Sequence, residues 1–184
     1  RSGQIGCRSC HREVQQHLPV LERGSSCYQE GHYPGGYTTE WGYGDEAPSS
    51  EDCLYLNVYT KAAGQVDKKL PVALWIHGGG YREGWGTEPE FDGQEWASKD
   101  VVLVTINYRL GIFGFMPYGE LSAESPHGVS GNYGILDQIQ SLKWIKENIA
   151  QFGGDPDNVT IFGQSAGAGS VQIEIGRASC RERV

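Results

Sequence analysis

The sequence predicts an α/β protein with a mostly parallel sheet. Two uninterrupted apolar runs, at residues 71–76 and 101–106, have the length and composition of strands that are buried on both faces. Apolar residues three and four positions apart predict a helix over about 135–149, and a further strand-like run follows at 159–162. Strands that alternate with a long helix favour a parallel sheet over a sandwich or a helical bundle.

Three further segments complete the predicted order of elements. From Leu54 to Tyr59 apolar and polar residues alternate, which predicts another strand entering the sheet. Residues 61–69 are polar and predict a turn, and the glycines and proline at 153–156 end the long helix. The 184 residues suit one ordinary domain and show no internal repeat.

Composition excludes several classes of function. The net charge is −8, and no long basic cluster is present, which argues against binding to nucleic acid or to anionic membrane surfaces. No apolar run approaches the roughly 18 residues that a membrane-spanning helix needs. The apolar fraction of 38% is enough for a packed core, so a folded protein is expected rather than a disordered one.

The first segment, residues 1–22, has little periodicity and is left unassigned, with a non-native origin as one interpretation. It contains Cys7-Arg8-Ser9-Cys10-His11, which has the form of a c-type haem attachment motif. A haem domain needs helices of its own and usually a second axial ligand, for which 22 residues leave no room. We therefore expect no cofactor and no metal.

The last segment resembles the translation of a common sequencing adapter over residues 175–184, with Glu174 at the junction. The alternative is a genuine Arg-rich C-terminus. On the first interpretation residues 174–184 are an artefactual tail, the domain occupies 23–173, and the natural protein continues beyond residue 173.

A candidate nucleophile stands after the last predicted strand, in Gly163-Gln164-Ser165-Ala166-Gly167. A strand that ends in G-x-S-x-G is the sequence form of a nucleophile elbow, in which the serine occupies a strained turn and its hydroxyl stands clear of the backbone. A flexible Gly/Ser loop is the alternative. Ser165 is thus the predicted nucleophile.

A candidate oxyanion-binding turn, His77-Gly78-Gly79-Gly80, follows the strand at 71–76. Consecutive glycines leave backbone N–H groups uncovered, so that they can point at one developing negative charge. Each such donor contributes about 2.7–4 kcal/mol to transition-state stabilisation. A merely flexible turn is the alternative, but two linked features in the right order, each after a strand, make it the weaker one.

Cys27 and Cys53 bracket a polar, aromatic-rich loop in which regular structure is not expected. A disulfide that closes this loop is the favoured interpretation and would stabilise the fold by about 3–4 kcal/mol. Two free buried cysteines in a reducing cell are the alternative.

Four motifs occur in order along the chain: S-E-D-C-L-Y-L-N at 50–57, W-I-H-G-G-G at 75–80, N-Y-R-L-G at 107–111 and F-G-Q-S-A-G-A at 162–168. Together they resemble the type-B carboxylesterase/lipase family, which includes the cholinesterases. The resemblance runs from about Cys27 to Gln172 and implies the N-terminal part of an α/β-hydrolase fold. It also implies Ser165 as nucleophile, with the N–H groups of Gly79, Gly80 and Ala166 as the oxyanion hole. A Cys27–Cys53 disulfide and a buried structural ion pair between Arg109 and Asp137 are implied as well.

The function that this resemblance implies is hydrolysis of small carboxylic esters through an acyl-enzyme. The family's acid and its histidine lie downstream of the elbow, beyond residue 184, while His77 is held structurally in the oxyanion turn and His127 does not match the base. We therefore expect the 184 residues by themselves to be inactive. Gln164 replaces the glutamate that is frequent before the serine in cholinesterases, which disfavours choline esters.

Two alternatives and several open points accompany this reading. A non-catalytic, cholinesterase-like adhesion protein would share the scaffold but commonly lacks the serine, and a peptidase of similar fold does not fit residues 50–57. The expected disulfide favours an oxidising compartment, so secretion or another extracytoplasmic location is predicted. The sequence does not identify the natural ester, the source or the oligomeric state.

Overall fold

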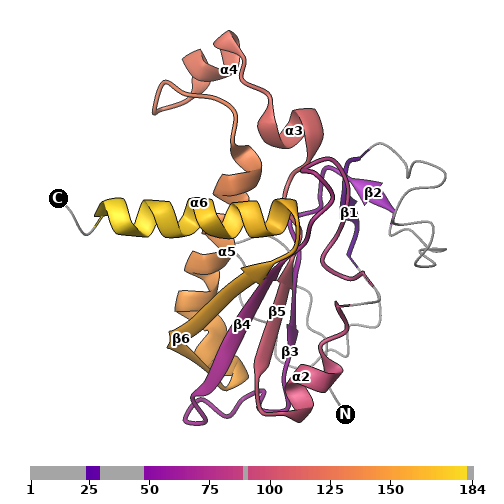
Figure 1. Cartoon of the computed structure of the whole chain (residues 1–184), viewed down its shortest axis with the longest axis vertical. Coiled ribbons are helices and arrows are strands. Elements are labelled where there is room, and N and C mark those ends of the chain that lie inside the picture. The colour runs from indigo at the N-terminus through magenta and orange to yellow at the C-terminus, as the bar shows by residue number, and fades with distance from the viewer. Residues whose placement is uncertain (1–23, 30–47, 89–90, 182–184) are drawn as a thin grey trace.

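The computed structural model describes residues 24–29, 48–88 and 91–181, the last five of these by their backbone only. The Cys7–His11 motif lies outside the described residues. Figure 1 shows the elements in space. They are β1 (Ser26–Cys27), β2 (Ser49–Ser50), β3 (Leu56–Tyr59), β4 (Leu70–Ile76), α2 (Gln94–Ser98), β5 (Val102–Ile106), α3 (Gly111–Phe115), α4 (Gly119–Glu124), α5 (Tyr133–Asn148), the 3₁₀-helix η2 (Ile149–Phe152), β6 (Gly154–Gly163) and α6 (Ala166–Arg181).

The main sheet has the strand order β3-β5-β4-β6. β4 pairs in parallel with both β5 and β6, with Leu74 opposite Val104 on one side and Ile161 on the other. β3 pairs antiparallel with β5, with Leu56 opposite Ile106. The predicted mostly parallel sheet is confirmed, and its one antiparallel member within the described residues is the alternating strand that follows Cys53.

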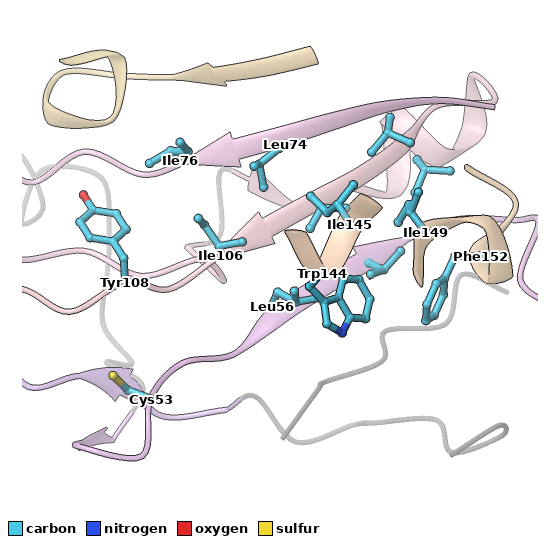
Figure 2. Close-up of a cluster of buried hydrophobic side chains, with 14 of the residues drawn as sticks. Cys53, Leu56, Leu74, Ile76, Ile106, Tyr108, Trp144, Ile145, Ile149 and Phe152 are labelled. Atoms are coloured by element: carbon cyan, nitrogen blue, oxygen red, sulfur yellow. The ribbon is translucent and has the colours of Figure 1, made fainter. Parts of the chain in front are cut away.

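One face of the sheet carries the larger core. In β4 and β5 the even-numbered residues point to this face because successive side chains of a strand alternate between faces. Figure 2 shows Leu74, Ile76 and Ile106 pointing toward the same space as Trp144 and Ile145 of α5. Val171 of α6 packs against the same cluster, so the two long helices cover this face together.

The opposite face carries a smaller apolar cluster from the odd-numbered residues. Ala73, Trp75 and Leu103 are buried there, and the Trp75 ring lies 4.1 Å from the ring of Phe91. Trp96 of α2 approaches Phe162 of β6, with 5.3 Å between ring centroids. Both faces of β4 and β5 are therefore covered, as their uninterrupted apolar sequences predict.

The predicted long helix is α5, but its buried side differs from the apolar pattern. Leu136 is exposed, whereas the polar residues Gln138 and Ser141 are buried. Gln138 donates from Nε2 to the hydroxyl of Ser170, which lies on α6, at 3.1 Å. A polar contact between the two helices thus takes a place that periodicity alone would give to an apolar one.

The ends of several elements differ from the sequence-based expectation. β6 begins at Gly154, directly after Gly153 in the left-handed region (φ +80°), so the strand is longer than the run 159–162. The short helices α2, α3 and α4 were not predicted. α6 continues through residues 174–181, which does not test whether the tail is native.

Parallel strands place their carboxyl ends at one edge of the sheet, and this edge gathers the motifs. The turns after β4, β5 and β6 all lie there. Because β3 is antiparallel, its amino end lies at the same edge and brings Cys53 with it. Figure 1 shows α6 starting from this edge, where β6 ends.

Candidate active site

Ser165 forms the corner between β6 and α6. Its φ of +54° lies in the left-handed region, which is costly for a residue with a side chain. The residue is exposed, so its hydroxyl is accessible. A serine held in this way between a strand and a helix has the geometry of a nucleophile elbow.

The glycines of this elbow are required by close backbone packing. A Cβ on Gly163 would lie 2.6 Å from the carbonyl carbon of Gly167 and 2.7 Å from the carbonyl oxygen of Ile76. A Cβ on Gly167 would overlap that same oxygen and lie 2.7 Å from the carbonyl oxygen of His77. The elbow is therefore pressed against the end of β4.

The turn after β4 lies directly beside the serine. A Cβ on Gly78 would lie 3.3 Å from the Cβ of Ser165 and would overlap the Gln164 side chain. Gly79 and Gly80 both have positive φ, at +89° and +62°. Alanine at either position would be strained, and at Gly79 it would also collide with the backbone of Glu83.

Three backbone N–H groups at this place are available to a ligand. The amides of Gly79 and Gly80 make no hydrogen bond with any group in the described part of the chain. Ala166 is the first residue of α6, and the first four N–H groups of a helix have no partner within it. The partial positive charge of a helix N-terminus also favours an anion here. The structure thus brings Ser165 together with the residues expected to bind the oxyanion.

His77 is fully buried behind this turn. Its Nδ1 lies 3.0 Å from the carbonyl oxygen of Gly78, and since a carbonyl only accepts, Nδ1 carries the proton. The ring stacks on Tyr108 at 4.3 Å, and the Tyr108 hydroxyl donates to the carbonyl oxygen of His77 at 2.9 Å. Burial lowers the pKa of His77 to about 4. Its protonated nitrogen is engaged and its ring is enclosed, so His77 supports the turn and is not placed to act as a base.

Arg109 and Asp137 form a bidentate ion pair that joins the turn after β5 to α5. Arg109 Nε donates to Oδ2 of Asp137 at 2.8 Å and a terminal guanidinium nitrogen donates to Oδ1 at 2.7 Å. The backbone N–H of Arg109 adds a third bond, at 3.0 Å. The Asp137 side chain is 7% exposed but that of Arg109 is 38% exposed, so the pair is half-buried rather than fully buried.

Cys27 and Cys53 are joined by a disulfide, and both residues are buried. Ser26 and Cys27 form a short parallel pair of strands with Ser49 and Ser50. The bond therefore holds two segments together at the edge of the sheet where the turns meet.

Gln29, beside the disulfide, was not singled out by sequence reasoning, and the side chain of Asn107 received no role of its own. Both bind backbone groups near the oxyanion turn. No composition or spacing signal marks a glutamine or an asparagine that binds backbone far away in sequence, so these contacts had to come from the structure.

Within the described residues we find no helix with the length and hydrophobicity needed to cross a bilayer. The same residues contain no group of His, Cys, Asp and Glu side chains that could hold a metal ion.

Comparison with known proteins places this geometry in a family. The model of the carboxylesterase family matches residues 12–179. The chain belongs to the carboxylesterase family. The α/β-hydrolase fold predicted from the sequence is confirmed by solved esterase structures, which the chain resembles over part of their length.

Relatives of this chain share between about a third and a half of the aligned residues. Fumonisin B1 esterase of Sphingopyxis macrogoltabida is 54% identical over 69% of this chain and 23% of its own length. Para-nitrobenzyl esterase of Bacillus subtilis is 51% identical over 66% of this chain and 24% of its own length. The structure of an esterase from Clostridium hathewayi is 37% identical and matches with a TM-score of 0.69, over 79% of this chain and 29% of that one.

The chain spans about a quarter of the length of these carboxylesterase relatives. The family model begins within residues 1–22, which the sequence left unassigned with a non-native origin as one interpretation, and ends within 174–184, for which the sequence predicted an artefactual tail. That origin remains a prediction.

Proposed function

We propose that the intact protein is a serine carboxylic-ester hydrolase that works through an acyl-enzyme at Ser165. The observation that supports this most strongly is the position of Ser165. It is exposed and held in the left-handed region, and it stands beside a turn whose amides of Gly79 and Gly80 lack partners in the described residues. Membership of a family whose relatives are named as esterases agrees with it.

In the first step the Ser165 hydroxyl attacks the carbonyl carbon of an ester, and a general base takes its proton. The carbonyl oxygen becomes an oxyanion, which accepts hydrogen bonds from the N–H groups of Gly79, Gly80 and Ala166. Each donor of this kind contributes about 2.7–4 kcal/mol to the stability of the transition state. The bond to the alcohol oxygen then breaks, the alcohol leaves with a proton, and the acyl group stays on Ser165.

In the second step water gives a proton to the base and attacks the acyl carbon, and the same amides hold the new oxyanion. The bond between the acyl carbon and the Ser165 oxygen then breaks, Ser165 recovers a proton, and the carboxylic acid leaves. Both steps need a base and an acid, and neither histidine that the structure describes is a candidate. His77 is buried with a pKa of about 4, and His127 stands in an exposed loop that follows α4. We propose that sequence outside these 184 residues supplies both groups, so that the 184-residue chain is inactive by itself.

The proposed substrate class follows from the chemistry of the site. Gln164 is exposed, and its side chain lies next to Gly78. A neutral amide there gives no ion pair to a cationic alcohol, so uncharged esters are proposed over choline esters. The disulfide between Cys27 and Cys53 supports a secreted or otherwise extracytoplasmic location.

The test is Ser165→Ala in the full-length protein, with turnover of p-nitrophenyl acetate as the measurement. Loss of the nucleophile should lower kcat by about 10⁴-fold or more, as removal of a triad member does in other serine hydrolases. Ser98→Ala, an exposed serine on α2, is the matched control and should keep wild-type activity. Retained turnover by Ser165→Ala would exclude the proposal.

A fluorophosphonate probe separates catalysis from the alternative of a non-catalytic adhesion protein. The full-length protein should be labelled covalently, and Ser165→Ala and the 184-residue chain should not. A full-length protein that is neither labelled nor active would favour the adhesion function.

A further inference from the structure

Three consecutive N–H groups in the loop behind the oxyanion turn each donate to a side chain. Gly84 donates to Oε1 of Gln29 at 2.8 Å and Trp85 to Oε1 of Glu88 at 3.1 Å. Gly86 donates to Oδ1 of Asn107 at 2.7 Å. Two side chains from distant parts of the chain, Gln29 and Asn107, and one from the loop itself, Glu88, therefore hold this loop.

The loop in turn supports the oxyanion turn by direct packing. A Cβ on Gly84 would overlap Nδ1 of His77 and lie 3.0 Å from its Cε1, so the backbone of Gly84 rests on the His77 ring. The carbonyl oxygen of Gly79 accepts hydrogen bonds from the N–H groups of Arg82 and Glu83, at 3.0 and 3.1 Å. A shift of Gly84 would hence displace both His77, which its backbone contacts, and Gly79, which its neighbour Glu83 binds.

The side-chain amides of Gln29 and Asn107 also bind the backbone on both sides of the disulfide, at Cys27 and Cys53. Gln29 Nε2 donates to the carbonyl oxygen of Cys27 at 3.1 Å and also to that of Gly84 at 3.3 Å. Asn107 Nδ2 donates to the carbonyl oxygens of Cys53 and Ser25, at 3.0 and 2.9 Å. Each half of the disulfide is thus connected to the loop by one side-chain amide.

We propose that Gln29 and Asn107 are positioning residues for the oxyanion hole, and that the Cys27–Cys53 disulfide is the anchor to which they hold it. The inference rests on the proposed ester hydrolysis. An oxyanion hole stabilises charge only if its donors are already in place, within about 0.5 Å, when the charge develops. Amides that fix the loop behind those donors act on the transition state more than on the bound ester.

Gln29 is the better position to test because it is half-buried and lies outside the main sheet. Gln29→Met keeps the length of the side chain and removes its hydrogen bonds. We expect kcat to fall about tenfold, which corresponds to about 1.4 kcal/mol, with KM unchanged. Gln29→Glu keeps an acceptor for the Gly84 N–H, so its kcat should lie between the values of the wild type and Gln29→Met.

The experiment uses the full-length protein, p-nitrophenyl acetate as substrate and a trifluoromethyl ketone as transition-state analogue. The analogue forms a tetrahedral adduct with the serine, so its inhibition constant should rise by the same factor as kcat falls. A residue that only stabilises the fold would move the melting temperature without moving this constant. Gln94→Met is the matched control, since the Gln94 side chain is exposed on α2 and binds only Asp92 among the described residues.

A double-mutant cycle tests the anchor. In a background of Cys27→Ala and Cys53→Ala, Gln29→Met should lower kcat by less than about threefold, because the amide has already lost its fixed support. The full tenfold loss in that background would overturn the role of the disulfide.

The outcomes distinguish this inference from the proposed function. An active wild type whose kcat and ketone inhibition are unaffected by Gln29→Met, or whose KM alone rises, overturns the inference and leaves ester hydrolysis intact. A wild type without turnover and without fluorophosphonate labelling overturns both. If Gln29→Met does not fold, Gln29→Glu decides, with about a threefold lower kcat expected and an unchanged kcat contradicting the inference.

Discussion

The turns that meet at the active-site edge are built in two different ways. The turns after β4 and β6 fit together through bare backbone, with Gly163 and Gly167 in contact with the carbonyl groups of Ile76 and His77. The turn after β5 is held by side chains instead: Asn107 by its amide and Arg109 by its ion pair with Asp137.

This difference separates the proposed reacting groups from their supports. Positions 78–80, where we propose that the amides of Gly79 and Gly80 bind the oxyanion, are glycines for steric reasons: a Cβ at 78 or 79 would collide with its neighbours, and residues 79 and 80 have positive φ. Where a turn must be fixed without touching a ligand, polar side chains with several hydrogen bonds do so from behind. Substitutions at the two kinds of turn should therefore destabilise the protein for different reasons. At the turns after β4 and β6 the cause is collision, and at the turn after β5 it is the loss of hydrogen bonds or charge.

The largest effect is expected from Gly167→Ala. In a helix alanine is favoured over glycine, but here its Cβ would collide with the carbonyl oxygen of Ile76. We expect the free energy of unfolding to fall by about 3 kcal/mol, the upper range for overpacking, together with loss of esterase activity. Urea unfolding of the full-length protein measures the first, and p-nitrophenyl acetate turnover the second.

Gly119→Ala is the matched control for this prediction. Gly119 is also helical, but nothing lies within 4 Å of the place where its Cβ would be. Alanine there should leave stability unchanged or raise it by about 0.5–1 kcal/mol. Equal effects at the two glycines would contradict the view that backbone contact holds the elbow.

Arg109→Met tests the turn that is held by charge. It leaves the carboxylate of Asp137 mostly buried without its cation, although the Arg109 N–H still donates to it. Loss of a fully buried partner costs about 3–5 kcal/mol, and the exposure of Arg109 reduces the expected loss to about 2–3 kcal/mol. Denaturant unfolding measures it. Adding Asp137→Asn should recover part of the loss, and no recovery would show that the charge of Asp137 is not the cause.

His77 gives the turn after β4 a dependence on pH. The folded pKa is about 4 and the ordinary value is 6.5, so the unfolded chain binds more protons between these values. The stability that the neutral ring contributes is complete above about pH 6.5 and is lost as the pH falls toward 4. From about pH 7 to pH 5 this residue should lower the free energy of unfolding by about 2 kcal/mol.

The control is His77→Gln, which lacks a titrating group and should remove that part of the slope whatever its own stability. Unfolding curves at both pH values, for wild type and variant, measure the difference. The same slope in both proteins would mean that His77 is not the group responsible.

Much of this fold could be predicted because its signals are local. The apolar runs that became β4 and β5, the periodicity of α5 and the strand before Ser165 each depend on a few neighbouring residues. The turns at 163–167 and 77–80 could be predicted for the same reason, because each comes directly after a strand in the sequence.

The rest depends on contacts between distant residues. The antiparallel direction of β3, which brings Cys53 to the active-site edge, follows from its pairing with β5 and not from its alternating sequence. Gln138 is buried because Ser170 on another helix receives its amide, while Leu136 points outward although it fits the apolar period. Gln29 binds Gly84 far along the chain, and nothing near either residue indicates it.

The smallest effect is expected where two charged side chains meet on the surface. Lys146 and Asp157 form an ion pair, as Arg109 and Asp137 do, but both side chains are largely exposed. The hydrogen bond and the charge of Lys146 lower the pKa of Asp157, so any stabilisation is present at neutral pH and disappears as the pH falls through that pKa. Water and salt screen such a pair, and ordering two mobile side chains opposes it. Asp157→Asn should therefore leave the melting temperature of the full-length protein unchanged, in low salt as in high salt, whereas Arg109→Met lowers it in both. A clear loss on Asp157→Asn would show that burial is not what distinguishes the two pairs, and that the fold depends on charge at its surface as much as at its active-site edge.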